Sequence, residues 1–113
     1  MPISSKFPAA AALSLALAAA PIALASGGAT ATATPTHVKQ GKFVSMLVKG
    51  MKPNERVKAH ELAPFGQTRN LYPRAGSGGN LLVKVKAQVK GKHTWTFTGR
   101  SSHRSAKTAY YVK

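Results

Sequence analysis

The stretch that decides the fold is Leu81-Leu82-Val83-Lys84-Val85-Lys86-Ala87-Gln88-Val89-Lys90. Every second residue from Leu81 to Val89 is apolar, and three of the five alternate residues from Leu82 to Lys90 are lysines. A period of two places the apolar side chains on one face of a strand and the lysines on the other. This alternation is typical of an antiparallel strand with one buried and one solvated face. The sequence therefore predicts a strand over 81–90.

The same alternation recurs along the chain, and turn residues separate its occurrences. It predicts further strands at 42–49, 55–62, 93–98 and 105–113, and a shorter one at 68–72 within a Gly- and Pro-rich segment. No stretch after residue 30 has the apolar spacing of an amphipathic helix. About six or seven short strands with regular turn signals predict an all-β fold, a small antiparallel β-sandwich or barrel.

The charge of the chain is strongly one-sided. Among 113 residues there are 17 Lys and Arg but only two acidic residues, Glu55 and Glu61, which gives a formal net charge of +15. There is no cysteine, so disulfides, thiolate zinc sites and thiol nucleophiles are excluded. Two glutamates six residues apart are also a poor basis for a carboxylate-rich metal site or a catalytic carboxylate pair.

The N-terminal part of the chain has the pattern of an export signal. Residues 1–25 contain Lys6, an Ala- and Leu-rich run, and a small-x-small motif at 23–25, which predicts a cleaved signal peptide and a secreted protein. An uncleaved membrane anchor is the alternative, but the run is mostly alanine and is interrupted by proline and serine. Residues 26–35 are of low complexity and are expected to form a flexible leader, followed by one domain over 36–113.

Two segments resemble the bacterial immunoglobulin-like (fibronectin-III-like) β-sandwich modules of secreted and surface proteins. Residues 41–57 (GKFVSMLVKGMKPNERV) are similar to the pattern G-x-x-V-x-V-x-G-x-G-F-x-P-G-E-x-V, with Met51 in place of Phe and Asn54 in place of Gly. Residues 91–99 (GKHTWTFTG) and the ending Thr108-x-Tyr110-x-Val112 resemble later strands of the same module. The resemblance implies an immunoglobulin-like sandwich. Because such modules are mostly adhesive, spacer or surface-binding units, it also implies a protein that is not an enzyme and has no cofactor.

The lysines of the deciding stretch are the main candidate binding residues. Lys84, Lys86 and Lys90 share one side of the predicted strand, with Lys92 just beyond it, and these four are expected to form a polyanion-binding patch. A secondary basic patch is expected from Lys49, Lys52, Arg56 and Lys58. The alternative is that strand lysines only maintain solubility and protect an edge, but ordinary surfaces mix both signs of charge.

An exported polycation has several candidate partners. Anionic cell-envelope polymer or acidic polysaccharide is the partner we expect, and extracellular nucleic acid is possible only as a non-specific ligand because no DNA-reading motif is present. The rival hypothesis is a structural or adhesive module with incidental charge. It would bind a protein partner by strand addition to an open terminal strand at 109–113.

Other candidate sites are weak. The four histidines, at 37, 60, 93 and 103, have no metal-ligand spacing, so no metal site is expected. Ser102 and His103 with Glu61 lack the nucleophile elbow of a hydrolase. The Gly-rich segment 76–80 lacks a phosphate-loop lysine and a following helix, and is expected to be a hairpin loop.

Overall fold

The computed structural model describes residues 23–26 and 28–113, which form two packed β-sheets. The strands are β2 (Ala23–Ser26), β3 (Thr30–Thr34), β4 (His37–Val38), β5 (Phe43–Lys49), β6 (Val57–Leu62), β7 (Thr68–Leu71), β8 (Leu81–Lys86), β9 (Gly91–Gly99) and β10 (Ser105–Val112). A short 3-10 turn, η1 (Pro64–Gly66), joins β6 to β7. Within these residues, no helix has the length and apolarity needed to cross a membrane.

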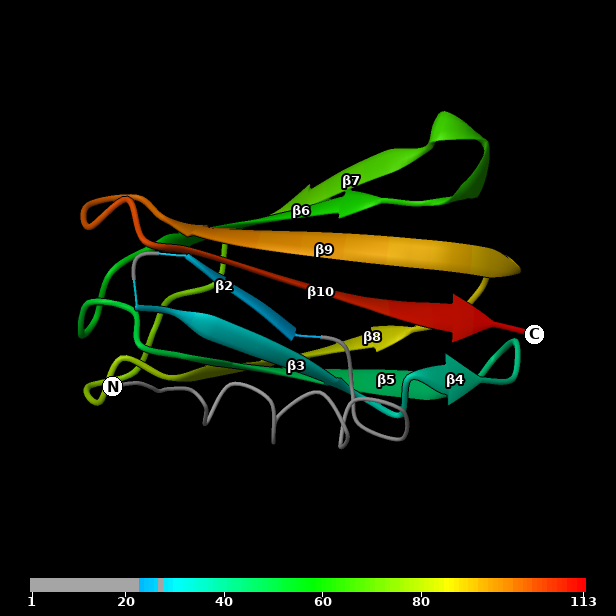
Figure 1. Cartoon of the computed structure of the whole chain (residues 1–113), viewed down its shortest axis with the longest axis horizontal. Helices are drawn as coiled ribbons and strands as arrows, with labels where there is room; N and C mark the ends of the chain where they lie inside the picture. Colours follow the sequence, from blue (N-terminus) through cyan, green and yellow to red (C-terminus); the bar gives the residue numbers. More distant parts are fainter. Residues whose placement is uncertain (1–22, 27) are drawn as a thin grey trace, which may run out of the picture.

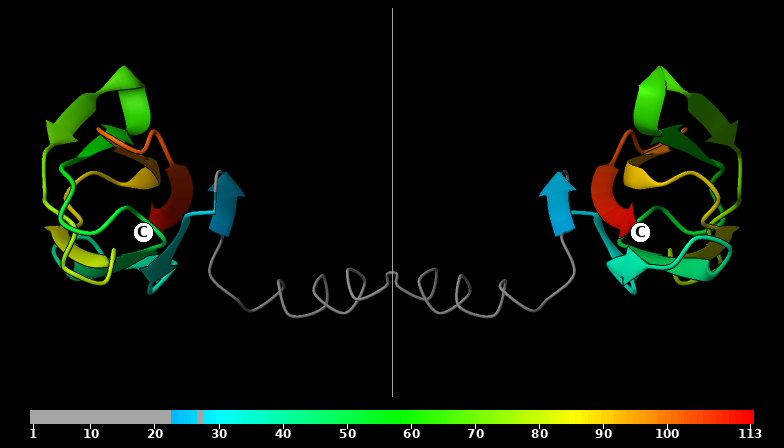
Figure 2. Two further views of the ribbon diagram at one scale, coloured as in Figure 1. Left: turned by 90° about the vertical axis from the view of Figure 1, so that its left-hand side faces the viewer. Right: turned by 90° about the vertical axis from the view of Figure 1, so that its right-hand side faces the viewer.

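The two sheets have different sizes and lie face to face (Figure 1). The smaller sheet has the order β3-β5-β8, and both of its pairings are antiparallel. The larger has the order β2-β10-β9-β6-β7, with antiparallel pairing throughout, and β4 adds to β10 in parallel. Figure 2 shows the two layers along the long axis, with β2 beside the C-terminal strand β10. The architecture is therefore an all-β sandwich, as the alternation predicted.

The core lies between the two sheets and is filled mainly by every second residue of β3, β5, β6, β8 and β9, together with inward residues of β10. The smaller sheet contributes the aliphatic residues of β5 and β8, and the larger sheet contributes the aromatic residues of β9 and β10. The largest completely buried side chains are Trp95, Tyr110, Phe97 and Met46. Burial of these apolar surfaces is the main favourable contribution to folding of a chain that has no cysteine.

The predicted strands are confirmed in place, and apart from the end of the strand expected over 81–90 their bounds differ from the prediction by at most two residues. The strand expected over 55–62 begins at Val57, and the one expected over 81–90 ends at Lys86. The second difference has a clear cause. Ala87 exchanges hydrogen bonds with the turn before β5, and the chain then crosses from the smaller sheet to β9 of the larger one. Val89 therefore lies outside the strand, and its side chain is only half-buried.

The turn between β5 and β6 places Asn54 in a left-handed backbone conformation. Asn54 stands where the similar modules have glycine, and it adopts a positive φ of 62°. Asparagine is among the few residues other than glycine that tolerate this left-handed conformation. The N–H of Asn54 donates to the carbonyl of Gly76 at 3.0 Å, which connects this turn to the loop before β8.

The flexible leader predicted over 26–35 is wrong for its second half. Thr30–Thr34 form β3, which pairs along its whole length with residues 45–49 of β5. Ala29, Ala31 and Ala33 are completely buried, while Thr30 and Thr34 are exposed. The domain therefore begins before residue 36, because the alternating Ala and Thr supply an edge strand. The predicted signal peptide over 1–25 lies mostly outside the described residues.

The open terminal strand predicted at 109–113 is also wrong. β10 has β9 on one side along its whole length. On the other side β2 pairs with residues 105–108 and β4 pairs with residues 111–112. The N–H of Tyr111 also donates to the carbonyl of Thr36 at 2.8 Å. A partner strand therefore finds little free backbone at this end of β10.

Strand β3 can be tested by placing a carboxylate on each of its faces. Ala31→Asp should lower the free energy of unfolding by about 3–5 kcal/mol, because it buries an uncompensated charge in the core. Thr34→Asp, on the solvent side of the same strand, should change it by less than about 0.5 kcal/mol. Equilibrium unfolding in urea measures both. Two equally small effects would mean that residues 30–34 are a loose leader.

Candidate functional site

Three segments that are distant in the sequence meet at one end of the sandwich. The N–H of Gln40 donates to the carbonyl of Lys113 at 3.3 Å, and the side-chain amide of Gln40 donates to the carbonyl of Gln88 at 2.5 Å. The N–H of Gly41 donates to the carbonyl of Ala87 at 2.6 Å. These bonds hold the turn before β5, the crossing between β8 and β9, and the end of β10 side by side.

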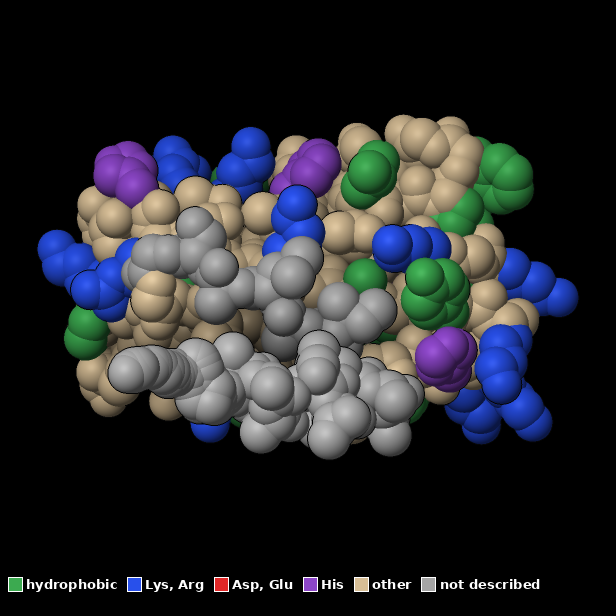
Figure 3. Space-filling view, in the orientation of Figure 1, with side chains coloured by type: hydrophobic (Ala, Val, Ile, Leu, Met, Phe, Trp, Pro, Cys, Tyr) green, Lys and Arg blue, Asp and Glu red, His purple; other side chains and the backbone are tan. Residues whose placement is uncertain are grey.

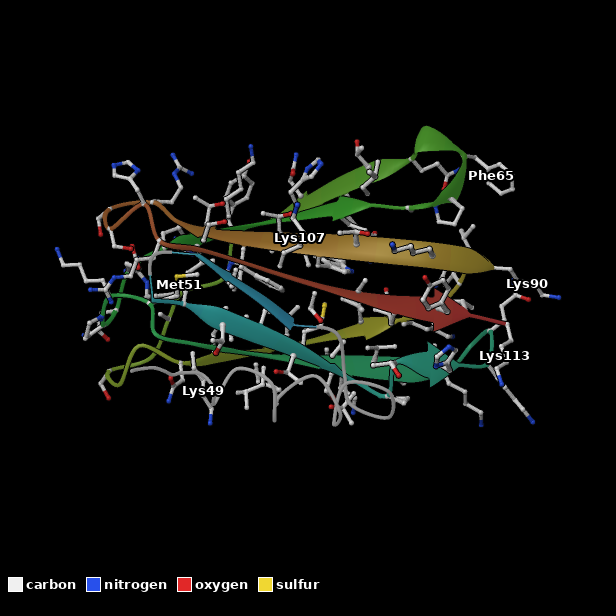
Figure 4. All side chains as sticks on the ribbon, viewed as in Figure 1. Lys49, Met51, Phe65, Lys90, Lys107 and Lys113 are labelled. Carbon is white, nitrogen blue, oxygen red and sulfur yellow. The ribbon has the colours of Figure 1, made fainter. Side chains whose placement is uncertain are left out.

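This end of the molecule carries a concentration of positive charge. We call it the basic end, and it consists of six exposed lysines: Lys39, Lys42, Lys86, Lys90, Lys92 and Lys113. Figure 4 labels Lys90 and Lys113 there, and Figure 3 shows Lys and Arg side chains gathered at the same end, with no acidic side chain visible on that face. The two carboxylate side chains of the sequence, on Glu55 and Glu61, are both buried.

The four lysines of the predicted main patch do not share one face of one strand. Lys84 and Lys86 project from β8 in the smaller sheet, whereas Lys92 projects from β9 in the larger sheet. Lys90 lies in the crossing between these strands. Three of the four belong to the basic end, and Lys84 lies two residues before Lys86 in β8, with its Nζ 5.1 Å from the ring centroid of Phe43. The chain crosses between the sheets over residues 87–90, so even spacing in the sequence does not continue as one row of side chains.

The predicted secondary patch is divided in the same way. Lys49 lies on β5 of the smaller sheet and Lys58 on β6 of the larger one, while Lys52 is in the turn between them. Arg56 donates from a terminal nitrogen to the carbonyl of Tyr72 at 2.9 Å. These four cations are therefore spread over different surfaces, and one of them is used to hold a neighbouring loop.

A second candidate site is a row of polar side chains across the larger sheet. Glu61 lies directly opposite Arg69 of β7 on one side and Trp95 of β9 on the other. The alternation that turns Val57 and Ala59 into the core also turns Glu61 inward, so that its carboxylate is buried. The Nε of Arg69 donates to Oε1 of Glu61 at 3.2 Å, and the guanidinium lies 5.3 Å from the Trp95 ring centroid.

The histidine beside this carboxylate is buried and has an acceptor at each ring nitrogen. Nδ1 of His93 lies 2.8 Å from Oε2 of Glu61, and Nε2 lies 2.6 Å from the carbonyl oxygen of Val89. A neutral imidazole has only one N–H, so the two hydrogen bonds require one more proton, on the second nitrogen or on Glu61. In either arrangement Glu61 and His93 are together electrically neutral.

Tyr110 completes the buried cluster. Its ring stacks on His93 with centroids 5.0 Å apart, and its hydroxyl lies 3.4 Å from Oε2 of Glu61. Burial raises the pKa of Tyr110, and the nearby Glu61 carboxylate raises it further despite the opposing hydrogen bond from the indole of Trp95. The phenol is therefore protonated at neutral pH and can donate to the carboxylate.

This cluster forms part of the wall of a cavity on the side of the sandwich where β7 and β8 are the edge strands of the two sheets. We call this side the open flank. The cavity has a volume of about 220 Å³ and lies between the β6–β7 hairpin of the larger sheet and the β8 end of the smaller one. Glu61 and His93 are on its inner side, and Arg69 and Lys86 supply its cationic side chains. The arrangement can hold a small polar ligand against a preorganised set of charges.

Glu55, the other buried carboxylate, joins two loops at the opposite end of the sandwich. It accepts hydrogen bonds from the N–H and hydroxyl of Ser102 at 3.0 and 2.7 Å, from both corresponding groups of Ser101 at 3.1 Å, and from the N–H of Lys52 at 2.7 Å. A side chain at Gly99 would collide with this carboxylate, so glycine is needed there. The group holds the β9–β10 turn against the turn before β6.

The pKa of Glu55 reflects these bonds. Burial alone would raise the pKa of this carboxyl, but the hydrogen bonds from Ser102, Lys52 and Ser101 favour the ionised form and lower the pKa from 4.5 to about 2. Ser102 is thereby occupied as a donor to Glu55, while Glu61 pairs with His93. The combination of Ser102, His103 and Glu61 considered from the sequence is not assembled.

The histidines are dispersed. His37 stacks on Tyr111 with ring centroids 5.4 Å apart, and Nδ1 of His60 lies 2.8 Å from the side-chain oxygen of Asn70. His103 occupies a turn with a positive φ of 63°. Among residues 23–26 and 28–113, no three side chains of the His, Asp and Glu types come together as metal ligands.

Sequence reasoning missed the cluster around Glu61. The signal was present, because the period of two in β6 places residue 61 on the same face as Val57 and Ala59, and His93 begins the inward series of Trp95 and Phe97. Two ionisable residues at inward positions of neighbouring strands predict a buried pair.

The role of Glu55 can be tested with Glu55→Gln. The substitution replaces a charge-assisted acceptor by an amide and should lower the free energy of unfolding by about 2 kcal/mol at pH 7. Because the folded-state pKa is lowered, the stabilisation by Glu55 is complete above about pH 4.5 and is lost as the pH falls toward about 2.

Denaturant unfolding of the wild type and the variant at several pH values between these limits measures the effect. The gap between the two proteins should narrow as the pH falls, and a gap that is constant with pH would contradict the assignment. Ser101→Ala, which removes one donor and keeps the carboxylate, is a control with a smaller loss and a preserved pH dependence.

Comparison with known proteins places the fold but not a family. No protein-family model matches the chain, and no curated protein matches it. Among solved structures, macromomycin is similar with a TM-score of 0.55 at 13% identity, covering 74% of this chain and 98% of that one. A superoxide reductase (neelaredoxin) from Ignicoccus hospitalis is similar with a TM-score of 0.55 at 13% identity, covering 79% and 83% of the two chains. At such identities the likeness concerns the fold alone.

These similarities correct one expectation from the sequence. The inference that the protein is not an enzyme rested on the resemblance to noncatalytic modules, and it is wrong as an inference from fold, because a superoxide reductase has a similar fold. A β-sandwich of this kind is compatible with catalysis as well as with binding.

Proposed function

We propose that the protein binds anionic polymers of the cell envelope or the extracellular space through the basic end. The observation that carries this proposal is the gathering of six exposed lysines from three separate segments, in a chain whose two carboxylate side chains are both buried. Like charges brought this close destabilise a compact fold unless a counter-charge is present. A polyanion supplies that counter-charge.

The chemistry of the basic end favours recognition of charge rather than of sequence. Lysine ammonium groups act as mobile point charges, without the bidentate fork by which arginine reads base edges or single carboxylates. Binding would therefore be driven largely by the release of counterions from the polymer and should fall steeply as salt rises. Acidic polysaccharide and anionic envelope polymer fit this chemistry, and nucleic acid would bind only non-specifically.

Export and the finer fold type are part of the same proposal. Secretion rests on the signal-like pattern of residues 1–25. An immunoglobulin-like arrangement is supported by the order of the strands. β3, β5 and β8 face β10, β9, β6 and β7, and β4 pairs in parallel with β10. In this proposal β3, β5 and β8 would be strands A, B and E of an immunoglobulin sandwich, and β10, β9, β6 and β7 would be strands G, F, C and C′.

The experiment that tests the function compares two variants with the same loss of charge. In the first, Lys39, Lys42, Lys90 and Lys113 of the basic end are all replaced by Gln. In the second, Lys49, Lys52, Lys58 and Lys107, which are exposed and lie away from that end, are replaced instead. Binding to a polyuronate such as alginate is measured by calorimetry over about 50 to 500 mM salt, with duplex DNA as the comparison polymer.

The basic-end variant should lose about ten-fold or more in affinity for the polymer and should show a shallower salt dependence. The control variant should lose much less. Equal losses in both variants would assign binding to the overall charge and not to the basic end. No measurable binding by the wild type at low salt would contradict the proposed function itself.

A further inference from the structure

The cavity at the open flank has features that the basic end does not need. It lies beside β6 and β7, and its inner side is formed by the buried cluster of Glu61 and His93 rather than by exposed lysines. Its volume of about 220 Å³ is below that of a drug-sized pocket, so it suits a small ligand. We infer that this cavity is a binding site for a small sugar acid, whose carboxylate is held by Arg69 and Lys86.

The charge of the cavity selects an anion. Because the hydrogen bonds of His93 require an extra proton, Glu61 and His93 together are neutral, and they leave Arg69 and Lys86 as the uncompensated groups. Two positive charges facing one small space attract a carboxylate and repel an amine. Glu61 does not oppose such a ligand, because its charge is compensated by His93.

The geometry of Arg69 selects a group with two acceptor oxygens. Its Nε is engaged by Oε1 of Glu61, which fixes the plane of the guanidinium. In the described part of the chain its two terminal nitrogens have no hydrogen-bond partner, and 47% of the side chain is exposed. The edge that carries these nitrogens can therefore receive a carboxylate in the bidentate manner that favours arginine at such sites.

The remaining lining selects a hydroxylated ligand over an apolar one. Gln67, Thr68 and Gln88 line the cavity with amide and hydroxyl groups, and Ala63 and Val89 supply only small apolar surfaces. Pockets for apolar ligands are lined mostly by large aliphatic and aromatic side chains. A ring with several hydroxyls and one carboxylate, such as a uronic acid, matches both the polar lining and the two cations. It can be a free sugar acid or one unit of an acidic polysaccharide.

The test uses the intrinsic fluorescence of a tryptophan that contacts Arg69, one of the residues lining the cavity. Trp95 is the only tryptophan of the sequence and lies under the Arg69 guanidinium, so its fluorescence reports a change at Arg69. The purified protein is titrated with glucuronate, with glucose as the neutral match and with inorganic phosphate as a simple anion. Amide chemical shifts from NMR locate the binding in case the fluorescence is silent. A short oligouronate distinguishes a free sugar acid from a polymer unit, since only the latter should gain affinity with length.

Glucuronate should bind saturably, with amide shifts confined to β6, β7 and the end of β8, and glucose should bind at least about ten-fold more weakly. Arg69→Gln should raise the Kd for glucuronate by about ten-fold or more, and Arg69→Lys, which keeps the charge but loses the fork, by less. Lys49→Gln, which removes one charge far from the cavity, should leave the Kd unchanged. Thermal unfolding checks that the Arg69 variants are folded, and Lys86→Gln on the exposed face of β8 provides a second test that does not disturb Glu61.

Several results would overturn the inference. These are no saturable binding of glucuronate up to about 10 mM, equal binding of glucose or of phosphate, or an unchanged Kd in folded Arg69→Gln and Lys86→Gln. Shifts located at the basic end instead of β6 and β7 would also overturn it. The outcome is independent of the proposed function, because the polymer experiment leaves Arg69 and Lys86 intact.

Discussion

A buried carboxylate needs hydrogen bonds or positive charges to replace its lost hydration, and both glutamate side chains of this protein are buried. Glu55 obtains this compensation from hydrogen bonds donated by two loops, and Glu61 obtains it from Arg69, His93 and Tyr110. In each case the requirement draws together segments that the apolar core would not connect by itself. One carboxylate closes an end of the sandwich, and the other prepares the inner side of a cavity.

The crossing between β8 and β9 links the two candidate sites. It leaves the smaller sheet at Lys86, exchanges hydrogen bonds with the turn before β5, and enters the larger sheet at Gly91. On its outer side this crossing contributes Lys90 to the basic end, between Lys86 of β8 and Lys92 of β9. On its inner side the carbonyl of Val89 accepts the hydrogen bond that fixes His93. A single short connection therefore supports a surface suited to polymers and a cavity suited to a small anion.

The sequence was sufficient for the strands that alternate large apolar and charged residues, because burial on one face dominates their energetics. It was insufficient where the alternation used small residues, so that Thr30–Thr34 resembled a linker although Ala31 and Ala33 are completely buried. It also failed for Glu61, since a charge at an inward position breaks the pattern that defines the face. The basic end was only half predicted, because it is assembled from three segments and no spacing along one strand contains that information.

The burial of both carboxylates has a consequence for how the surface responds to acidity. Most protein surfaces contain groups that gain and groups that lose charge, and their sign changes at some pH. In this chain no carboxylate side chain faces the solvent, and protonation of histidines only adds charge of the same sign. The surface therefore stays positive from weakly acidic to weakly alkaline conditions. Any acid-dependent release of a bound polymer would then originate mainly in the polymer, and the pH of release would identify its anionic group.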